Sequence, residues 1–335
     1  MAETYYCGID LGTSRTSIAT STGVRLTTDT VVGYSKDLIA TKRFGVNHLF
    51  GKDAIENRLS LDMIWPLADG VIQSDAPKAI ETVKLILEES IRQAIPDKKP
   101  EDKLFVAVGV PAQASMQNKT DIVRLSKKIM DKLLIVSEPF AVAYGLNKFD
   151  EVLIVDLGAG TVDLVRIAGS FPTKEDQITL TTAGNFLDST ISEAILKKYP
   201  NVQLTKQIIK KVKEKHGFVS TSEKIVVTLT EAGKPKQFDI TDILQASCVA
   251  MTDPICKSVQ NLIADFDPEF QEKLRNNIIV AGGGSRLRGI DVAIEKGLIA
   301  YGGGEVTTVQ DAEFAGAEGS LKMALELPNK FWQRI

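Results

Sequence analysis

The chain has 335 residues, of which 44% are hydrophobic and 25% charged, and its formal net charge at pH 7 is −3. This composition is typical of a soluble globular protein. Because a single hydrophobic core stops growing at about 250 residues, we expect two lobes with a cleft between them. The small negative charge provides no basic field that would attract a nucleic acid or an anionic membrane, so we expect neither as a partner.

The cysteines and the N-terminal sequence indicate the compartment. Cys7, Cys248 and Cys256 form an odd set without Cys-x-x-Cys spacing, which argues against a disulfide framework or a zinc site. The first residues show no leader pattern, and no run reaches the ~18 apolar residues of a membrane-spanning helix. We therefore expect a cytoplasmic protein with reduced cysteines and without direct membrane insertion.

The first half of the chain alternates short apolar runs with turns and amphipathic stretches. Residues 5–10 form an apolar run that ends in a turn rich in glycine and hydroxyl side chains, which predicts a β-hairpin. Residues 31–73 are rich in turn residues and predict a small inserted subdomain. The pattern then predicts a helix over residues 78–94, a buried strand over 104–110, a helix over 122–132 and a strand over 133–136.

The second half shows a similar organisation. Residues 152–156 are a second apolar run followed by a turn of the same kind. Residues 185–240 are the expected counterpart of the first insertion. The pattern predicts helices over residues 189–198 and 206–215, strands over 225–229, 236–240 and 278–281, and a helix near Ile290.

The two hairpins carry the same sequence pattern, which indicates an internal duplication. Residues 9–18, with the sequence IDLGTSRTSI, align with residues 155–164, with the sequence VDLGAGTVDL. The separation is far too long for a solenoid repeat and favours two related domains. We therefore predict an α/β fold with one lobe over residues 1–150 and a second over residues 151–335.

Each repeated turn has the composition of a phosphate-binding loop. The first turn contains Gly12, Thr13 and Ser14, and the second contains Gly158, Ala159, Gly160 and Thr161. Glycine permits a close approach of backbone N–H groups to phosphate oxygens, and the hydroxyl groups add donors. An ordinary hairpin turn is the alternative for either copy alone, and the duplication makes phosphate binding the favoured interpretation.

Asp10 and Asp156 each end an apolar strand directly before these turns. A buried carboxylate needs a counter-charge or strong hydrogen-bond donors. Mg²⁺ keeps several waters and uses one or two carboxylates together with substrate phosphates, so it suits two such aspartates, which would contact it through water. The alternative is that each carboxylate accepts hydrogen bonds from the backbone of its own turn.

Three segments together resemble the nucleotide motifs of the actin/Hsp70/sugar-kinase superfamily: IDLGTS at residues 9–14, DLGAGTVD at residues 156–163, and AGGGS at residues 281–285. They are similar to the phosphate-1, phosphate-2 and adenosine motifs of that superfamily and occur in its order across almost the whole chain. The resemblance implies the actin-like fold, in which two ribonuclease-H-like lobes enclose a nucleotide. It also implies ATP or ADP as the ligand, together with Mg²⁺ at Asp10 and Asp156.

Two further segments resemble the connectors between the lobes of these proteins. Residues 138–145, which begin Glu138-Pro139, are similar to the first connector, and residues 315–317 are similar to the second. The resemblance implies that Glu138 orients the water that attacks the γ-phosphate. Asp156 can polarise the same water or the magnesium shell next to it. From the residues alone, Glu138 is equally well explained as a carboxylate stabilised by a helix N-terminus.

The remaining candidate residues lie in the second half. Gly184 and Asn185 resemble the element near the ribose and phosphates, and Lys213 and Glu214 lie where related proteins contact the nucleoside. For Lys213 a solvated helix face is an equal alternative, because further lysines surround it. The predicted adenosine-binding residues, with a tight strand-to-helix turn as their alternative, are Gly282, Gly283, Gly284 and Ser285.

Within the superfamily the chain is most similar to the bacterial actins, and among them to the magnetosome filament proteins. The segments that carry this similarity are residues 31–34, 66–71, 136–140, 184–188 and 326–328. The resemblance implies an ATPase that assembles head to tail with copies of itself, disassembles after hydrolysis, and lies beside magnetosome membranes with adaptor proteins. An MreB-like cell-shape filament, a metabolite kinase and a chaperone-like ATPase stay open as alternatives.

Overall fold

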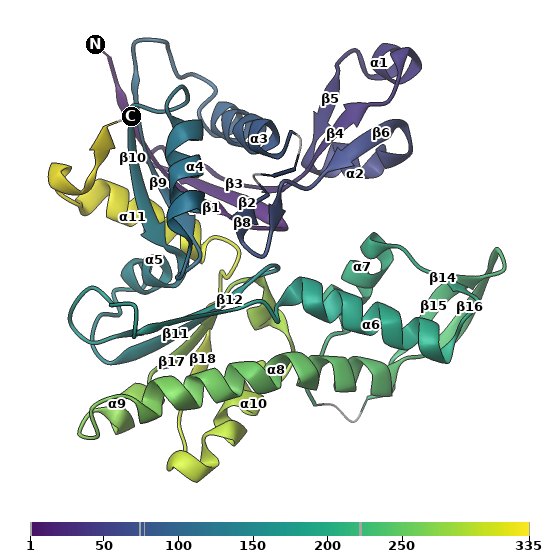
Figure 1. The fold of residues 1–335 in the computed structure, drawn as a ribbon, viewed down its shortest axis with the longest axis vertical. Coiled ribbons are helices and arrows are strands. Elements are labelled where there is room, and N and C mark those ends of the chain that lie inside the picture. Colours follow the sequence, from purple (N-terminus) through teal and green to yellow (C-terminus); the bar gives the residue numbers. More distant parts are fainter. Residues whose placement is uncertain (1, 74, 77, 221–222, 335) are drawn as a thin grey trace. The chain divides into compact units, whose positions relative to one another are not determined.

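The computed structural model describes residues 2–73, 75–76, 78–220 and 223–334, which form the helices and strands drawn in Figure 1. The chain divides into two compact units. The first unit combines residues Met1–Phe149 with Asp311–Ile335, and the second consists of Asp150–Gln310. Each unit contains a sheet with helices packed on it, as expected for an α/β protein.

The main sheet of the first unit has its described strands in the order β19-β10-β9-β1-β2-β3. β1 pairs with β2 as an antiparallel hairpin and with β9 in parallel, and β9 pairs in parallel with β10. The parallel strands place their carboxyl ends at one edge of the sheet. The bounds are β1 (Thr4–Leu11), β2 (Arg15–Thr20), β3 (Arg25–Asp29), β9 (Lys103–Val110), β10 (Lys132–Ser137) and β19 (Gln333–Arg334).

The helices of this unit follow the expected pattern with one displacement. Its longer helices are α3 (Ala79–Ala94), α4 (Met116–Ser126), α5 (Glu138–Gly145) and α11 (Ala315–Glu326), and a short turn, η4, spans Asn329–Phe331. The prediction of a helix over residues 122–132 was wrong in its position. The Ser115 hydroxyl caps α4 by accepting a hydrogen bond from the backbone N–H of Asn118, so the helix starts earlier than predicted.

The region predicted as a small insertion, residues 31–73, folds into its own elements. A small antiparallel sheet has its strands in the order β5-β4-β6, and β7 pairs with β8 in a hairpin that turns at Asp69 and Gly70, both with positive φ. The elements are β4 (Val32–Ser35), α1 (Leu38–Phe44), β5 (His48–Phe50), α2 (Gly51–Glu56), η1 (Arg58–Ser60), β6 (Leu61–Ile64), β7 (Leu67–Ala68) and β8 (Val71–Ile72).

The C-terminal segment belongs to the first unit, whereas the second lobe was predicted to run to residue 335. Small residues explain the difference, because they let α11 pack closely on β1 and α5. A Cβ added at Gly8 would lie 2.0 Å from the carbonyl oxygen of Ala317, and one added at Gly319 would lie 1.8 Å from that of Ala141. Such a close backbone approach tolerates only glycine.

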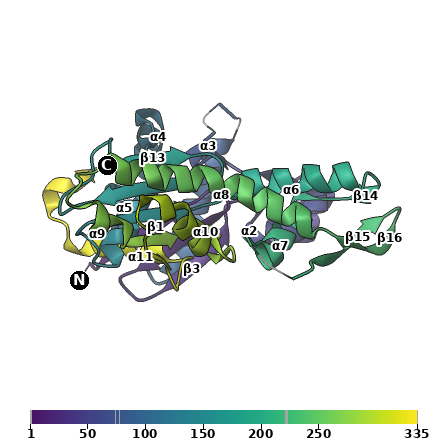
Figure 2. The same cartoon turned by 90° about the horizontal axis from the view of Figure 1, so that it is seen from below.

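The second unit has a sheet whose described strands follow the order β13-β12-β11-β17-β18, with β11 and β17 parallel. Figure 2 shows α6 and α8 lying side by side in this unit. The sheet strands are β11 (Val152–Leu157), β12 (Val162–Ile167), β13 (Gln177–Leu180), β17 (Ile278–Ala281) and β18 (Val306–Thr308). The helices are α6 (Gly184–Lys198), α7 (Lys206–His216), α8 (Thr241–Ala264), α9 (Gln271–Arg275) and α10 (Ile290–Gly297), with the short turns η2 (Gly283–Arg286) and η3 (Ile299–Tyr301).

A smaller antiparallel sheet of the second unit lies in the region predicted as its insertion, residues 185–240. Its strands are β14 (Val202–Gln203), β15 (Val226–Glu231) and β16 (Lys234–Asp239). Each unit has its own hydrophobic core, in which the parallel strands and the inner faces of the helices are buried. Within the described residues no helix is long and apolar enough to cross a membrane.

Candidate functional site

The first glycine turn is held by hydrogen bonds from two neighbouring segments. The Thr30 hydroxyl donates to the carbonyl oxygen of Gly12 at 2.7 Å, and the backbone N–H of Thr30 donates to that of Ser14 at 2.9 Å. The hydroxyl oxygen of Thr13 accepts the backbone N–H of Gly70 at 2.9 Å. The turn between β1 and β2 is therefore fixed before any ligand binds, which favours a preformed loop.

Asp10 and Glu138 both lie beside Gly109, at the carboxyl ends of the parallel strands. Asp10 is the register partner of Gly109, and Glu138 is the first residue of α5, directly after β10. A Cβ added at Gly109 would lie 3.8 Å from Cα of Asp10 and 3.1 Å from Cγ of Glu138. In sheets of this kind ligands bind at the carboxyl ends of the strands.

Gly109 and Gly316 were not predicted as parts of the site. Gly316 lies in the first turn of α11, where an added Cβ would be 2.9 Å from Oδ2 of Asp10. Gly109 interrupts the apolar run of β9, and a glycine inside a buried strand is a signal of close approach by another group. Gly316 has a weaker signal, because its contact with Asp10 joins distant parts of the chain.

In the second unit Asp156 ends β11 and lies against the start of the glycine run. Asp156 is the register partner of Ala281 at the end of β17, and it is 9% exposed. A Cβ added at Gly282 would lie 2.4 Å from Oδ1 of Asp156. Gly282 has φ 74° and ψ 169°, a conformation that is essentially restricted to glycine.

The other two glycines of the run have different surroundings. A Cβ added at Gly284 would lie 2.1 Å from Cδ2 of Leu157, so close packing explains this glycine. At Gly283 an added Cβ would meet no atom within 4 Å, and Gly283 is exposed. The Ser285 side chain is buried, and its backbone N–H donates to the carbonyl oxygen of Gly282 at 3.1 Å. A planar group of a ligand can therefore approach the backbone at Gly283.

The second glycine turn rests on the N-terminus of α6. The N–H of Gly158 donates to the carbonyl oxygen of Thr161 at 2.9 Å, which closes the turn. The N–H groups of Gly184 and Asn185 donate to the carbonyl oxygens of Gly158 and Ala159, at 3.2 and 2.7 Å. Gly184 and Asn185 therefore lie beside the turn, and Gly160 lies buried within it.

Lys213 and Glu214 lie on α7 in different surroundings. The Lys213 side chain is 16% exposed, and its ammonium lies 2.9 Å from the carbonyl oxygen of Gly184 and 2.9 Å from Oδ1 of Asp188. Glu214 is exposed. Lys213 thus does not lie on a solvated face, which removes that alternative, and its contacts are with α6.

The residues at the strand ends have the chemistry that a nucleotide with Mg²⁺ requires. Asp10 and Asp156 each lie against a glycine. Because glycine has no side chain, it leaves space beside each carboxylate. Carboxylate oxygens are the protein ligands that Mg²⁺ prefers, and backbone N–H groups in glycine turns suit phosphates. The donor set of each unit therefore fits the predicted ligand.

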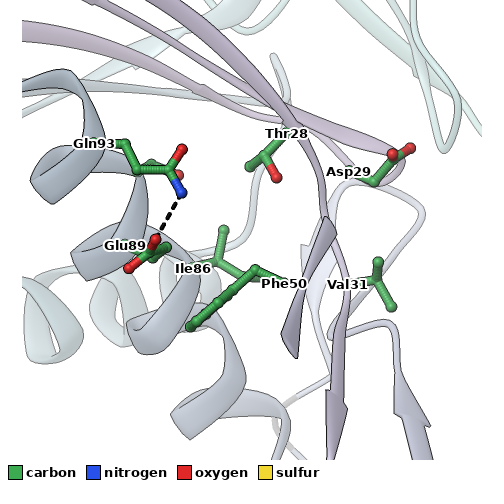
Figure 3. Close-up of a pocket in the computed structure, with 8 residues that line it drawn as sticks. Thr28, Asp29, Val31, Phe50, Ile86, Glu89 and Gln93 are labelled. Carbon is green, nitrogen blue, oxygen red and sulfur yellow. Dashed lines mark hydrogen bonds between the residues drawn. The ribbon is translucent and has the colours of Figure 1, made fainter. Parts of the chain in front are cut away.

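A small cavity of the first unit is unrelated to these residues. It has a volume of about 10 Å³, enough for about one water molecule, and lies between β3, the insertion and α3. Figure 3 shows Phe50 and Ile86 among its lining side chains, with the amide of Gln93 donating to Glu89 at 2.6 Å. Its size excludes a nucleotide.

The parallel strands that end in Asp-Leu-Gly turns in both units define an actin-like protein. A solved structure described as a MamK double helical filament supports this class, with a TM-score of 0.94 and 38% identity over 97% of this chain and 100% of that one. The MreB/Mbl protein family model matches residues 4–329, and the chain belongs to this family. The predicted actin-like fold and bacterial actin resemblance are confirmed.

The similarity to MamK extends over nearly the full length of both chains. The actin-like protein MamK of Paramagnetospirillum magneticum (strain AMB-1) is 38% identical over 98% of this chain and 95% of its own length. A structure of a non-polymerising MamK mutant bound to AMPPNP is 37% identical, with a TM-score of 0.74 over 97% of this chain and 100% of that one.

Proposed function

We propose that the chain is a cytoskeletal protein that polymerises into filaments with ATP and disassembles after hydrolysis. The observation that carries the proposal is the full-length similarity to MamK, including a MamK filament, combined with aspartates and glycine turns at the carboxyl ends of parallel strands. A head-to-tail contact that does not close into a ring generates a filament from one kind of subunit.

For the nucleotide, we assign the phosphates to the two glycine turns and the adenosine to the glycine run. The backbone N–H groups and hydroxyl groups of Gly12, Thr13 and Ser14 serve the phosphates, as do those of residues 158–161. Gly283 leaves its backbone accessible to the adenine ring, and Gly184 and Asn185 lie beside the second turn. The MamK structure with AMPPNP supports ATP or ADP as the ligand.

We assign Mg²⁺ to Asp10 and Asp156, through water. When bound, the ion would neutralise the negative charge of the phosphates. Glu138 holds the attacking water by accepting its hydrogen bond, and Asp156 polarises the same water. The position of Glu138 beside Gly109, the register partner of Asp10, supports this assignment.

In the cell we place the filament beside magnetosome membranes, bound to magnetosome-associated adaptor proteins. This assignment is supported by the 38% sequence identity to MamK of Paramagnetospirillum magneticum over 98% of this chain. Fluorescent labelling of the chain in its source cell tests the location. A linear signal that follows the magnetosomes supports the assignment, and a signal that follows the cell envelope instead favours a cell-shape filament.

Sedimentation tests assembly directly. With ATP and Mg²⁺ at tens of micromolar protein, we expect the chain to pellet in an ultracentrifuge and to release phosphate with a delay relative to assembly. Failure to pellet, together with ADP release that depends on a metabolite, would overturn the filament proposal in favour of a kinase.

The Glu138→Gln substitution tests the hydrolytic role. The amide keeps the size of the side chain but accepts the water's proton poorly, so we expect phosphate release to slow by about 10²- to 10⁴-fold. Assembly with ATP should persist, and disassembly should be delayed. The measurements are phosphate release and light scattering on the same sample. Phosphate release at the unmodified rate would remove Glu138 from the mechanism.

A further inference from the structure

Lys213 connects α7 to the first turn of α6. Its ammonium lies 2.9 Å from the carbonyl oxygen of Gly184 and 2.9 Å from Oδ1 of Asp188, both on α6. The Lys213 side chain is 16% exposed and that of Asp188 is 23% exposed. Water screens a contact between charged groups with so little exposure less than it screens a surface ion pair.

Gly184 lies close to both this ammonium and the second glycine turn. A Cβ added at Gly184 would lie 3.3 Å from Nζ of Lys213, 3.1 Å from Cα of Ala159 and 3.3 Å from the carbonyl oxygen of Gly158. The absence of a side chain lets both neighbours approach the same residue. A displacement of Gly184 is therefore transmitted to the turn.

The first turn of α6 also holds the glycine turn through hydrogen bonds. The N–H groups of Gly184 and Asn185 donate to the carbonyl oxygens of Gly158 and Ala159. With these carbonyl groups occupied, the turn has a fixed conformation, and the direction of its own N–H groups is fixed with it. The ammonium of Lys213 thus acts on the predicted phosphate donors through one helix turn.

We propose that Lys213, paired with Asp188, is a positioning residue that holds the N-terminus of α6 against the second phosphate-binding turn. Its ammonium binds the protein rather than the nucleoside. This assignment replaces the nucleoside contact expected from the family resemblance. It rests on the proposed function only for the role of the turn in binding phosphate.

Hydrogen exchange without nucleotide tests the positioning itself. In Lys213→Met we expect the amides of Gly184 and Asn185 to exchange about tenfold faster than in the unmodified chain, because the lost charge-assisted contact corresponds to about that factor. Lys211→Met is the matched control, since it removes an exposed lysine from the same helix. It should leave both amides unchanged. Unchanged exchange in Lys213→Met would overturn the proposal.

Ligand titration separates positioning from direct contact. With Mg²⁺ present, Lys213→Met should bind ADP about tenfold more weakly while its affinity for adenosine is unchanged, because only the phosphates contact the turn. An equal loss of affinity for ADP and adenosine would show that the ammonium contacts the nucleoside, and this would overturn the proposal.

Asp188→Asn keeps the test available if Lys213→Met does not fold. It should weaken ADP binding in the same way, and the double variant should be no weaker than the weaker single variant, because the two side chains act as one unit. Additive losses would contradict the proposal.

If the unmodified chain binds no ADP, the proposed nucleotide function fails, and the exchange measurement still decides the positioning role.

Discussion

The two glycine turns have nearly the same sequence pattern, yet the structure supports them in different ways. The first turn follows Asp10, whose carboxylate lies beside the first turn of α11, a helix from the far end of the sequence. The second turn is held by α6, the next helix along the chain. The difference indicates that the turn itself was duplicated while its support was built separately in each unit.

The surroundings of the Asp10 carboxylate therefore depend on the return of the chain into its unit at Asp311, whereas the turn itself is held by Thr30 and Gly70. Arg25 of β3 anchors this return segment by pairing with Asp311 and with Oε1 of Glu318 at 3.2 Å, and its guanidinium lies 4.0 Å from the ring centroid of Phe314. The second turn requires no such return. A change in the return segment should thus act on Asp10, and a change in α6 should act on the second turn.

The largest expected effect comes from the glycine that lies against Asp156. Gly282→Ala should destabilise the second unit by about 1–3 kcal/mol, because alanine cannot adopt this backbone conformation without strain and its Cβ would collide with the carboxylate. Gly283→Ala is the control, with no atom near its added Cβ, and should change stability by less than about 1 kcal/mol. Urea unfolding of both variants measures the difference, and equal stabilities would contradict the structural assignment.

Gly316, the glycine of α11 that lies against Asp10, should behave differently. At Gly316 an added Cβ would be 2.9 Å from Oδ2 of Asp10, but Gly316 lies in a helix, where alanine is favoured over glycine. We expect Gly316→Ala to keep the free energy of unfolding within about 1 kcal/mol of the unmodified value while it displaces the Asp10 side chain. ATP affinity in the presence of Mg²⁺ should fall about tenfold.

Calorimetric titration and urea unfolding of the same Gly316→Ala preparation check this expectation. Gly283→Ala serves as the control for the free energy of unfolding only, because we assign Gly283 to the adenine ring. Unchanged ATP affinity would show that Asp10 does not serve the ligand or its metal ion. A large loss of stability would show that the two aspartates have equivalent supports.

Local sequence patterns predicted the strands and turns of both units, but they did not predict which distant segments pack against them. The apolar runs and their turns predicted the strands, and the placement of Asp10 and Glu138 at strand ends followed from them. The contact of Gly316 with Asp10 joins residues from opposite ends of the chain, and no local pattern reports such packing. Likewise, the lysines of α7 look equivalent in sequence, and only the packing of α7 on α6 distinguishes Lys213.

The smallest expected effect is a pH dependence confined to the support of the second turn. Burial raises the pKa of Asp188 above its ordinary value, while Lys213 and Lys210 lower it and Glu214 raises it further. An acid whose pKa is higher in the folded state favours folding below its ordinary pKa, and this contribution is lost as the pH rises through the raised value. Asp188→Asn removes this titration.

Measured as a function of pH, the free energy of unfolding of Asp188→Asn relative to the unmodified chain should therefore increase as the pH rises above 3.8, the ordinary pKa of an aspartate. The slope is the informative quantity, because asparagine does not titrate and the difference therefore reports the titration of Asp188 in the unmodified chain. Urea unfolding at several pH values provides it. A flat difference would mean that the Asp188 carboxyl has the same pKa in the folded and unfolded states.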